Sequence, residues 1–220
     1  MSHVEGIRKF RNRVAHHDSL LGVDIPFEID RIFLVTGWIN SSAENWLREI
    51  SKCHETYDSR PVNPLNTVIV PAKIAWKTYT DTSVYICQPG RFFRDVSRIA
   101  FYNNKEIKPL VPEILERRDH VPWNDKEAQR LEETGNPNDR IVSDAIRASK
   151  AMKDSSGNPL YIEGAYQIFI LSDKQDLQKT KKMKSIVHHS KSGKGSAYVR
   201  KQRYCSLGSL LNASTTDDIG

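Results

Sequence analysis

An arginine and a histidine near the start of the chain have residue types and a spacing that suit cleavage of a phosphodiester. They are Arg11 and His16, within the sequence RNRVAHHD. A guanidinium is permanently charged and its planar fork matches a phosphate, whereas an imidazole titrates near neutrality and can move protons. With no metal ligands around them, these groups fit cleavage of RNA by its own 2′-hydroxyl. In that reaction one group moves the proton and the other stabilises the charge that develops on the phosphate.

A helix is expected to carry both groups. Ile7, Phe10 and Val14 recur at helical spacing, which predicts a helix over residues 4–17. At roughly 100° per residue, Arg11 and His16 lie about 140° apart on an ideal helix. We therefore expect them to converge only through the length of the arginine side chain, at a helix end, or across two subunits.

The motif and its flanking sequence resemble a known family. RNRVAHHD is similar to the signature of the Abi-like (abortive-infection) proteins, a branch of the HEPN superfamily, whose hallmark is Arg, a polar residue and then His after four to six positions. Arg11, Asn12 and His16 satisfy this pattern, and His17 fits the longer spacing. The sequence IDRIFLVTGWINSSAENWLREI is similar to the helices that follow the motif in these proteins, so the resemblance covers about residues 7–57.

The resemblance implies a metal-independent endoribonuclease of a defence or toxin type, without a cofactor. Such proteins act as homodimers that bring two motifs into one cleft, and an antitoxin is an expected partner. By position in the motif, Arg11 would hold the phosphate and His16 would do the acid–base work. Asn12 would support the site by hydrogen bonding, and His17 could substitute for His16.

One departure from the family bears on catalysis. In Abi-like proteins the motif lies in the latter part of a helical bundle, whereas only ten residues precede it here. We expect a truncated gene, a misplaced start, or a remnant used only for packing or dimerisation. Missing helices supplied by another polypeptide are a further expectation. The alternative interpretation of the motif is an arginine-rich helix with surface histidines and no catalysis.

The rest of the chain predicts a second domain of a different class. The sequence DSRPVNP follows the helical pattern and suggests a boundary, giving domains at residues 1–60 and 61–220. The expected fold class is α+β, with a partial, HEPN-like helical bundle followed by an α+β domain that has a curved mixed sheet or a small barrel. Helices are expected at residues 27–37, 41–57, 124–134 and 139–153, and strands at residues 67–70, 74–79, 84–88, 97–102, 166–171 and 197–204.

Some local signals in the second domain are more specific. The Asn-Asn pair at residues 103–104 predicts the turn of a β-hairpin. Asn124, followed three residues later by Glu127, is typical of a capped helix start. Glu116 and Asp119 are expected to be solvated charges on a helix or loop.

Positive charge is concentrated in one segment of this domain. The chain has 33 basic and 27 acidic residues, a net charge of +6, and nine of the basic residues lie between Lys179 and Arg203 with no acidic residue among them. A local basic field favours polyanions such as nucleic acid, although a solvated lysine-rich loop is the alternative. The residues expected to bind nucleic acid are Lys191, Lys194, Arg200, Lys201 and Arg203.

Two main classes of function therefore remain open. The first is RNA cleavage at the Arg11 motif. The second is a non-catalytic nucleic-acid-binding or regulatory protein that uses its helices for dimerisation and its basic domain for recognition. A third possibility is an enzyme whose site lies wholly in the second domain, with activity indifferent to Arg11 and His16. Tyr198 and Tyr204, interleaved with arginines, would stack on bases of a single strand in either class, or else pack in the core.

Composition excludes several other classes. Cys53, Cys87 and Cys205 stand far apart, which argues against a disulfide scaffold or a cysteine-based zinc site and indicates a reducing cytoplasm. The longest apolar-rich run, residues 32–39, is too short to span a bilayer, and the first residues lack the apolar core of a secretory signal. We expect no metal, no cofactor and no membrane association.

Overall fold

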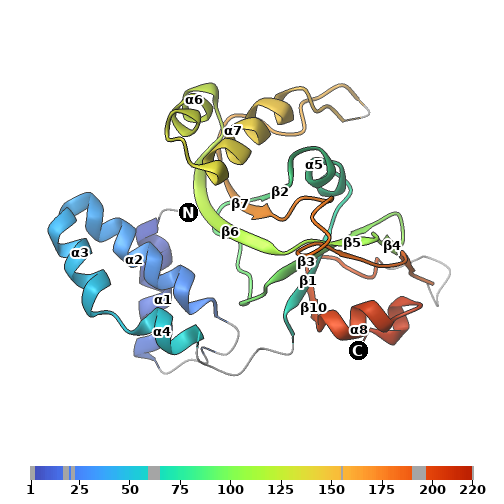
Figure 1. Ribbon diagram of the computed structural model, residues 1–220, viewed down its shortest axis with the longest axis horizontal. Coiled ribbons are helices and arrows are strands. Elements are labelled where there is room, and N and C mark those ends of the chain that lie inside the picture. Colours follow the sequence, from blue (N-terminus) through green and yellow to red (C-terminus); the bar gives the residue numbers. More distant parts are fainter. Residues whose placement is uncertain are drawn as a thin grey trace. The chain divides into compact units, whose positions relative to one another are not determined.

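The computed structural model describes residues 3–16, 20, 23–58, 65–154, 156–189 and 197–219 (Figure 1). The chain divides into two compact units, which are described separately. The helical unit comprises Met1–Asn63 together with Pro89–Asp95, and the α+β unit comprises Pro64–Gln88 together with Val96–Gly220.

The helical unit contains four helices among its described residues. They are α1 (His3–Ala15), α2 (Ile25–Ile39), α3 (Ser41–Ile50) and α4 (Cys53–Asp58). Asp24 caps α2 by accepting a hydrogen bond from the Phe27 amide at 3.1 Å. Asn40 ends α2 and caps α3, because its side chain accepts from the Ala43 amide at 3.0 Å. The helix expected over residues 41–57 is therefore two helices.

Helices α1 and α2 pack closely around a buried arginine. Arg31 of α2 is buried and forms an ion pair with Glu28 at 3.0 Å. Its guanidinium also lies 4.9 Å from the ring centroid of Phe27. A Cβ atom at Gly6 of α1 would lie 1.9 Å from Nη1 of Arg31, so the helices can approach this closely only because residue 6 has no side chain.

The core of the helical unit is small. Among the described residues of this unit, the buried ones are Gly6, Val23, Arg31, Phe33 and Phe93. Trp38 and Ile39, at the end of α2, are 62% and 83% exposed. Large apolar side chains are also exposed on α1 and α3. The helical unit therefore leaves much apolar surface uncovered within this chain.

The α+β unit is built on a curled mixed sheet that forms half of a barrel (Figure 1). Among the described residues, a five-stranded sheet has the order β10-β1-β3-β4-β9, a three-stranded sheet has the order β2-β7-β6, and β5 pairs with β8. Strand β1 is parallel to β3, and the other pairs are antiparallel. The strands are β1 (Thr67–Pro71), β2 (Val84–Cys87), β3 (Arg98–Asn103), β4 (Glu106–Ile107), β5 (Leu110–Val111), β6 (Ile114–Pro122), β7 (Ala165–Leu171), β8 (Lys181–Lys182), β9 (Ile186–Val187) and β10 (Arg203–Cys205).

Helices cover the sheets of this unit. Helices α6 (Asp125–Glu133) and α7 (Pro137–Lys150) lie against the three-stranded sheet (Figure 1) and share an apolar core with it. Helix α8 (Leu207–Asn212) contributes Leu210 to the core of the five-stranded sheet. Between the two sheets, the ring of Phe101 packs 6.3 Å from that of Tyr85 and 5.0 Å from that of Tyr79.

Two predicted strands differ from the structure. Residues 74–79 were expected to form a strand, but they belong to helix α5 (Ala75–Thr82) and the preceding turn. Its buried residues, Ala75, Thr78 and Tyr79, have the spacing of one helical face, which aromatic and β-branched composition alone does not reveal. The strand expected at residues 197–204 is also wrong, because only β10 pairs there, with three residues of β1.

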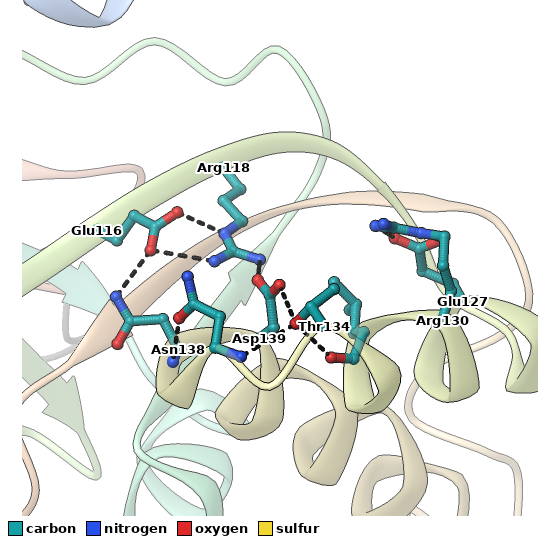
Figure 2. Close-up of polar contacts among 9 residues, drawn as sticks. Glu116, Arg118, Glu127, Arg130, Thr134, Asn138 and Asp139 are labelled. Atoms are coloured by element: carbon teal, nitrogen blue, oxygen red, sulfur yellow. Dashed lines mark hydrogen bonds and ion pairs between the residues drawn. The ribbon is translucent and has the colours of Figure 1, made fainter.

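Strand β6 was not predicted, because its charged side chains obscure it. Figure 2 shows Arg118 of β6 between two carboxylates: its Nε lies 2.6 Å from Glu116 and its Nη1 lies 2.5 Å from Asp139 of α7. Thr134 donates to Asp139 at 2.6 Å, and Asn138 donates to Glu116 at 2.8 Å. The expectation that Glu116 is a solvated charge is therefore wrong: it helps to fasten β6 to the helices.

Candidate functional site

The described part of the Arg11 motif lies at the exposed end of α1. Arg11 is exposed, and its Nη1 donates to Oδ1 of Asn12 at 3.0 Å. His16 follows the last residue of α1 and is also exposed. Its amide donates to the carbonyl of Asn12 at 2.9 Å, so the chain keeps its helical path as far as His16. The side chain of Asn12 thus contacts the Arg11 guanidinium, whereas its carbonyl makes only the ordinary helical backbone bond to the His16 amide.

Arg11 differs from Arg8 and Arg48 of the helical unit. Arg8 and Arg48 form ion pairs with carboxylates three or four residues away, at 2.7 and 2.9 Å. Arg11 forms no ion pair within the described part of the chain, and the His16 side chain makes no hydrogen bond there. Both groups are therefore available for a ligand.

Within one chain, the side chains of Arg11 and His16 do not come together. Because the helical path continues to residue 16, the two side chains leave the axis about 140° apart, with a rise of about 7.5 Å between them. Neither side chain makes a hydrogen bond to the other. His17, the expected substitute for His16, lies outside the described residues.

The basic segment of the α+β unit is described in part. Lys191 and Lys194 lie outside the described residues, and Arg200, Lys201 and Arg203 are exposed. The guanidinium of Arg203, on β10, lies 4.2 Å from the ring centroid of Tyr198. Among the described residues Arg203 forms no ion pair, so its charge is not compensated by a carboxylate there.

The two tyrosines of the basic segment have different surroundings. Tyr204 is partly buried, and its hydroxyl accepts from Nε2 of Gln202 at 2.7 Å. Tyr198 packs against the core of the five-stranded sheet, with its ring 6.0 Å from that of Tyr102. Burial raises the pKa of Tyr198 above its usual value.

His188 was not among the predicted site residues, yet it lies beside Tyr198. The two ring centroids are 5.5 Å apart, and Nδ1 of His188 is 2.7 Å from Oγ1 of Thr216. His188 and Thr216 are 28 residues apart, and no motif links them. Only the fold could show that they meet.

A β-bulge in β6 is a further unpredicted feature. Arg118 pairs with Ile168, but the next pair joins Val121 to Tyr166. Two residues of β6, Asp119 and His120, therefore lie opposite one residue of β7. His120 has a φ of 56°, which is uncommon for a residue other than glycine. The Asp119 carboxylate is buried and lies 3.3 Å from Nδ1 of His120, which corrects the expectation that Asp119 is solvated.

Searches for a metal centre and for membrane spans gave negative results. Within the part of the chain that the structure describes, no three His, Cys, Asp or Glu side chains are grouped as metal ligands. None of the helices there combines the length and apolar character needed to cross a bilayer.

Comparisons with known proteins found no similar protein. No protein-family model matches the chain, and searches of curated proteins and of solved structures found no match either.

Proposed function

We propose that the chain is a metal-independent endoribonuclease of the Abi-like type, with Arg11 and His16 as its catalytic groups. The observation that carries the proposal is the state of these two side chains at the end of α1. Both are exposed, and Arg11 has no ion pair in the described part of the chain. The side chain of Asn12 accepts a hydrogen bond from Arg11, which supports its role in holding that guanidinium.

The proposed reaction needs only these groups and the RNA. An imidazole takes the proton from the ribose 2′-hydroxyl, and the 2′-oxygen attacks the adjacent phosphorus. The bond from phosphorus to the 5′-oxygen breaks, and that oxygen receives a proton from an imidazolium. The products are a 2′,3′-cyclic phosphate and a 5′-hydroxyl. The guanidinium of Arg11 stabilises the negative charge that develops on the phosphate.

The proposed site is completed by a second copy of the chain. Because Arg11 and His16 leave the helix about 140° apart, one copy does not direct both groups at the same phosphate. The exposed Trp38 and Ile39 supply apolar surface of the kind that is buried when subunits associate. In a symmetric dimer, two imidazoles could act as the base and the acid.

The test is cleavage of labelled single-stranded RNA by the purified chain in EDTA. We expect Arg11→Ala and His16→Ala each to lower the cleavage rate by about 100-fold or more. Lys9→Ala and His189→Ala are matched controls, because both residues are exposed and lie outside the motif, and they should leave the rate unchanged. The products should carry 2′,3′-cyclic phosphate ends. Cleavage that is indifferent to Arg11 and His16, or absent in every preparation, contradicts the proposal.

A second candidate function is nucleic-acid binding without cleavage. The contact between Arg203 and Tyr198 favours it, since an arginine without an ion pair in the described residues lies on an aromatic ring beside exposed basic residues. Binding that weakens with salt, in a chain that does not cleave RNA, would support this function over the first.

A further inference from the structure

Five side chains from separate segments of the α+β unit converge at one end of the five-stranded sheet. We call them the Tyr198 cluster, and they are Tyr102, His188, Tyr198, Arg203 and Thr216. The ring of Tyr198 lies at the centre, 6.0 Å from Tyr102 and 5.5 Å from His188. The guanidinium of Arg203 lies 4.2 Å from the same ring. His188 and Arg203 thus both lie against the ring of Tyr198.

The fold fixes His188 within this cluster. Its Nδ1 is 2.7 Å from the hydroxyl of Thr216, which is buried. The adjoining residue Thr215 caps a short 3₁₀ helix, whose capping box with Asp218 holds this part of the chain in place. The amide of His188 also donates to the carbonyl of Lys105 at 2.7 Å. The imidazole is therefore oriented by Thr216, and the backbone that carries it is fixed by Lys105.

The backbone of Tyr198 is hydrogen-bonded, but its hydroxyl group is not. The backbone amide of Tyr198 donates to the hydroxyl of Tyr102 at 3.3 Å. The Oη atom of Tyr198 is closed to solvent and has no hydrogen-bond partner among the described residues. Buried polar atoms in native proteins are nearly always paired, so an orphan of this kind calls for a missing partner.

Arg203 is the exposed positive charge of the cluster. It is exposed, and within the described residues its contact is with the ring of Tyr198 and not with a carboxylate. The charged groups that act on Tyr198 are Arg203 and Asp217. A guanidinium that is held only by a ring can turn toward an anion and pair with it through two hydrogen bonds.

We propose that the Tyr198 cluster binds a phosphate group of single-stranded RNA. Arg203 would pair with the phosphate, and a phosphate oxygen would accept from the Tyr198 hydroxyl once Arg203 turns aside. His188 would lie at the same phosphate, held by Thr216. The choice of RNA rests on the proposed function. The site itself lies in the α+β unit and shares no residue with the Arg11 motif.

The first test measures RNA binding and stability in the same variants. The His16→Ala chain is used in EDTA, with a labelled 12-nucleotide RNA as the probe in fluorescence anisotropy. We expect Arg203→Ala to weaken binding about tenfold or more, and Tyr198→Phe to weaken it about threefold to tenfold. Arg140→Ala and His189→Ala serve as matched controls for an exposed arginine and an exposed histidine.

Tyr198→Phe separates binding from a structural role. Removing a buried hydroxyl that lacks a partner should raise the melting temperature of the free chain. The reason is that folding then no longer buries a polar group without a hydrogen bond. A higher melting temperature together with weaker RNA binding is the expected result. If Arg203→Ala and Tyr198→Phe bind RNA as tightly as Arg140→Ala does, the proposal is overturned.

Competition distinguishes RNA from a free anion. Inorganic phosphate and adenosine monophosphate are added to the anisotropy assay at matched phosphate concentration. We expect the RNA to displace the probe at concentrations at least 100-fold lower than either competitor. Equal potency of inorganic phosphate would contradict the assignment to RNA. A chain that cleaves no RNA, but whose Tyr198 cluster variants lose RNA binding, would contradict the nuclease proposal. The same result would support the phosphate site at the Tyr198 cluster.

Discussion

Gly6 shows how one residue sets the packing of the helical unit. A methyl group there would lie 1.9 Å from Nη1 and 2.7 Å from Cζ of Arg31. Arg31 cannot move away cheaply, because it is buried and paired with Glu28. A glycine inside a helix is itself unfavourable by about 1 kcal/mol relative to alanine. The close approach of two helices therefore outweighs helix propensity at this position.

Gly6→Ala is expected to have opposite effects on stability in the natural chain and in a chain that carries Arg31→Ala. In the natural chain it should lower the free energy of unfolding by about 1–3 kcal/mol through overpacking. In an Arg31→Ala background it should raise that free energy by about 1 kcal/mol, since only helix propensity remains. Urea denaturation of the four chains measures both effects. The same sign in both backgrounds would show that Arg31 is not the obstacle.

At the scale of elements, charged groups join β6 to α7. Burial alone would raise the pKa of Asp139, but hydrogen bonds from Thr134 and Arg118 hold it below its usual value. A carboxyl group whose pKa is lower in the folded chain stabilises the fold above its unfolded pKa, near 3.9. That contribution is lost as the pH falls through the lower, folded pKa.

Asp139→Asn tests this contribution. At pH 7 the variant should lose about 1–3 kcal/mol of stability, because Arg118 loses a charged partner. Between pH 5 and pH 2 the natural chain should lose stability more steeply than the variant does. Asp144→Asn, at an exposed position of α7, is the matched control and should keep the steep loss. Equal slopes for the natural chain and Asp139→Asn would contradict the assignment.

Elements with local signals could be predicted from the sequence, and elements that depend on distant partners could not. Asn124 accepts a hydrogen bond from the Glu127 amide, as the pattern indicated. The predicted hairpin is confirmed, with Tyr102 paired to Ile107 across a turn in which Asn104 has a φ of 53°. Strand β6 escaped prediction because the partners of its charged residues lie some 20 residues away on α7.

The same distinction holds for the candidate sites. Arg11, Asn12 and His16 are close in sequence, so their proximity on α1 could be predicted. Their convergence on a substrate stays a prediction, since it depends on a second copy. The pairing of His188 with Thr216 left no pattern in the sequence, because it depends on how β9 and the 3₁₀ helix meet.

At the scale of the whole molecule, the helical unit has a small core and a large exposed apolar surface. Its buried residues, among those described, are Gly6, Val23, Arg31, Phe33 and Phe93, and one of them is charged. Small cores contribute little stability by themselves. We therefore expect that association with a second copy stabilises this unit and that stability depends on protein concentration.

Ile39→Asp tests the association. Sedimentation velocity of the natural chain should show a dimer that forms with rising concentration. The variant should remain monomeric and should cleave RNA at least tenfold more slowly, since the proposed site needs two copies. Leu177→Asp, at a similarly exposed apolar position in the α+β unit, is the matched control and should change neither property. A natural chain that is monomeric at every concentration would contradict the dimer.

The strand order of the five-stranded sheet has a consequence for biosynthesis. Its two outer strands, β10 and β9, follow its inner strands β1, β3 and β4 in the chain. While the ribosome is still translating the residues before Ile186, the nascent inner strands have unpaired backbone groups on both flanks. The five-stranded sheet can be completed only after Cys205 has been translated, so this unit completes its folding late. Until then a chaperone that shields strand edges would protect it from aggregation.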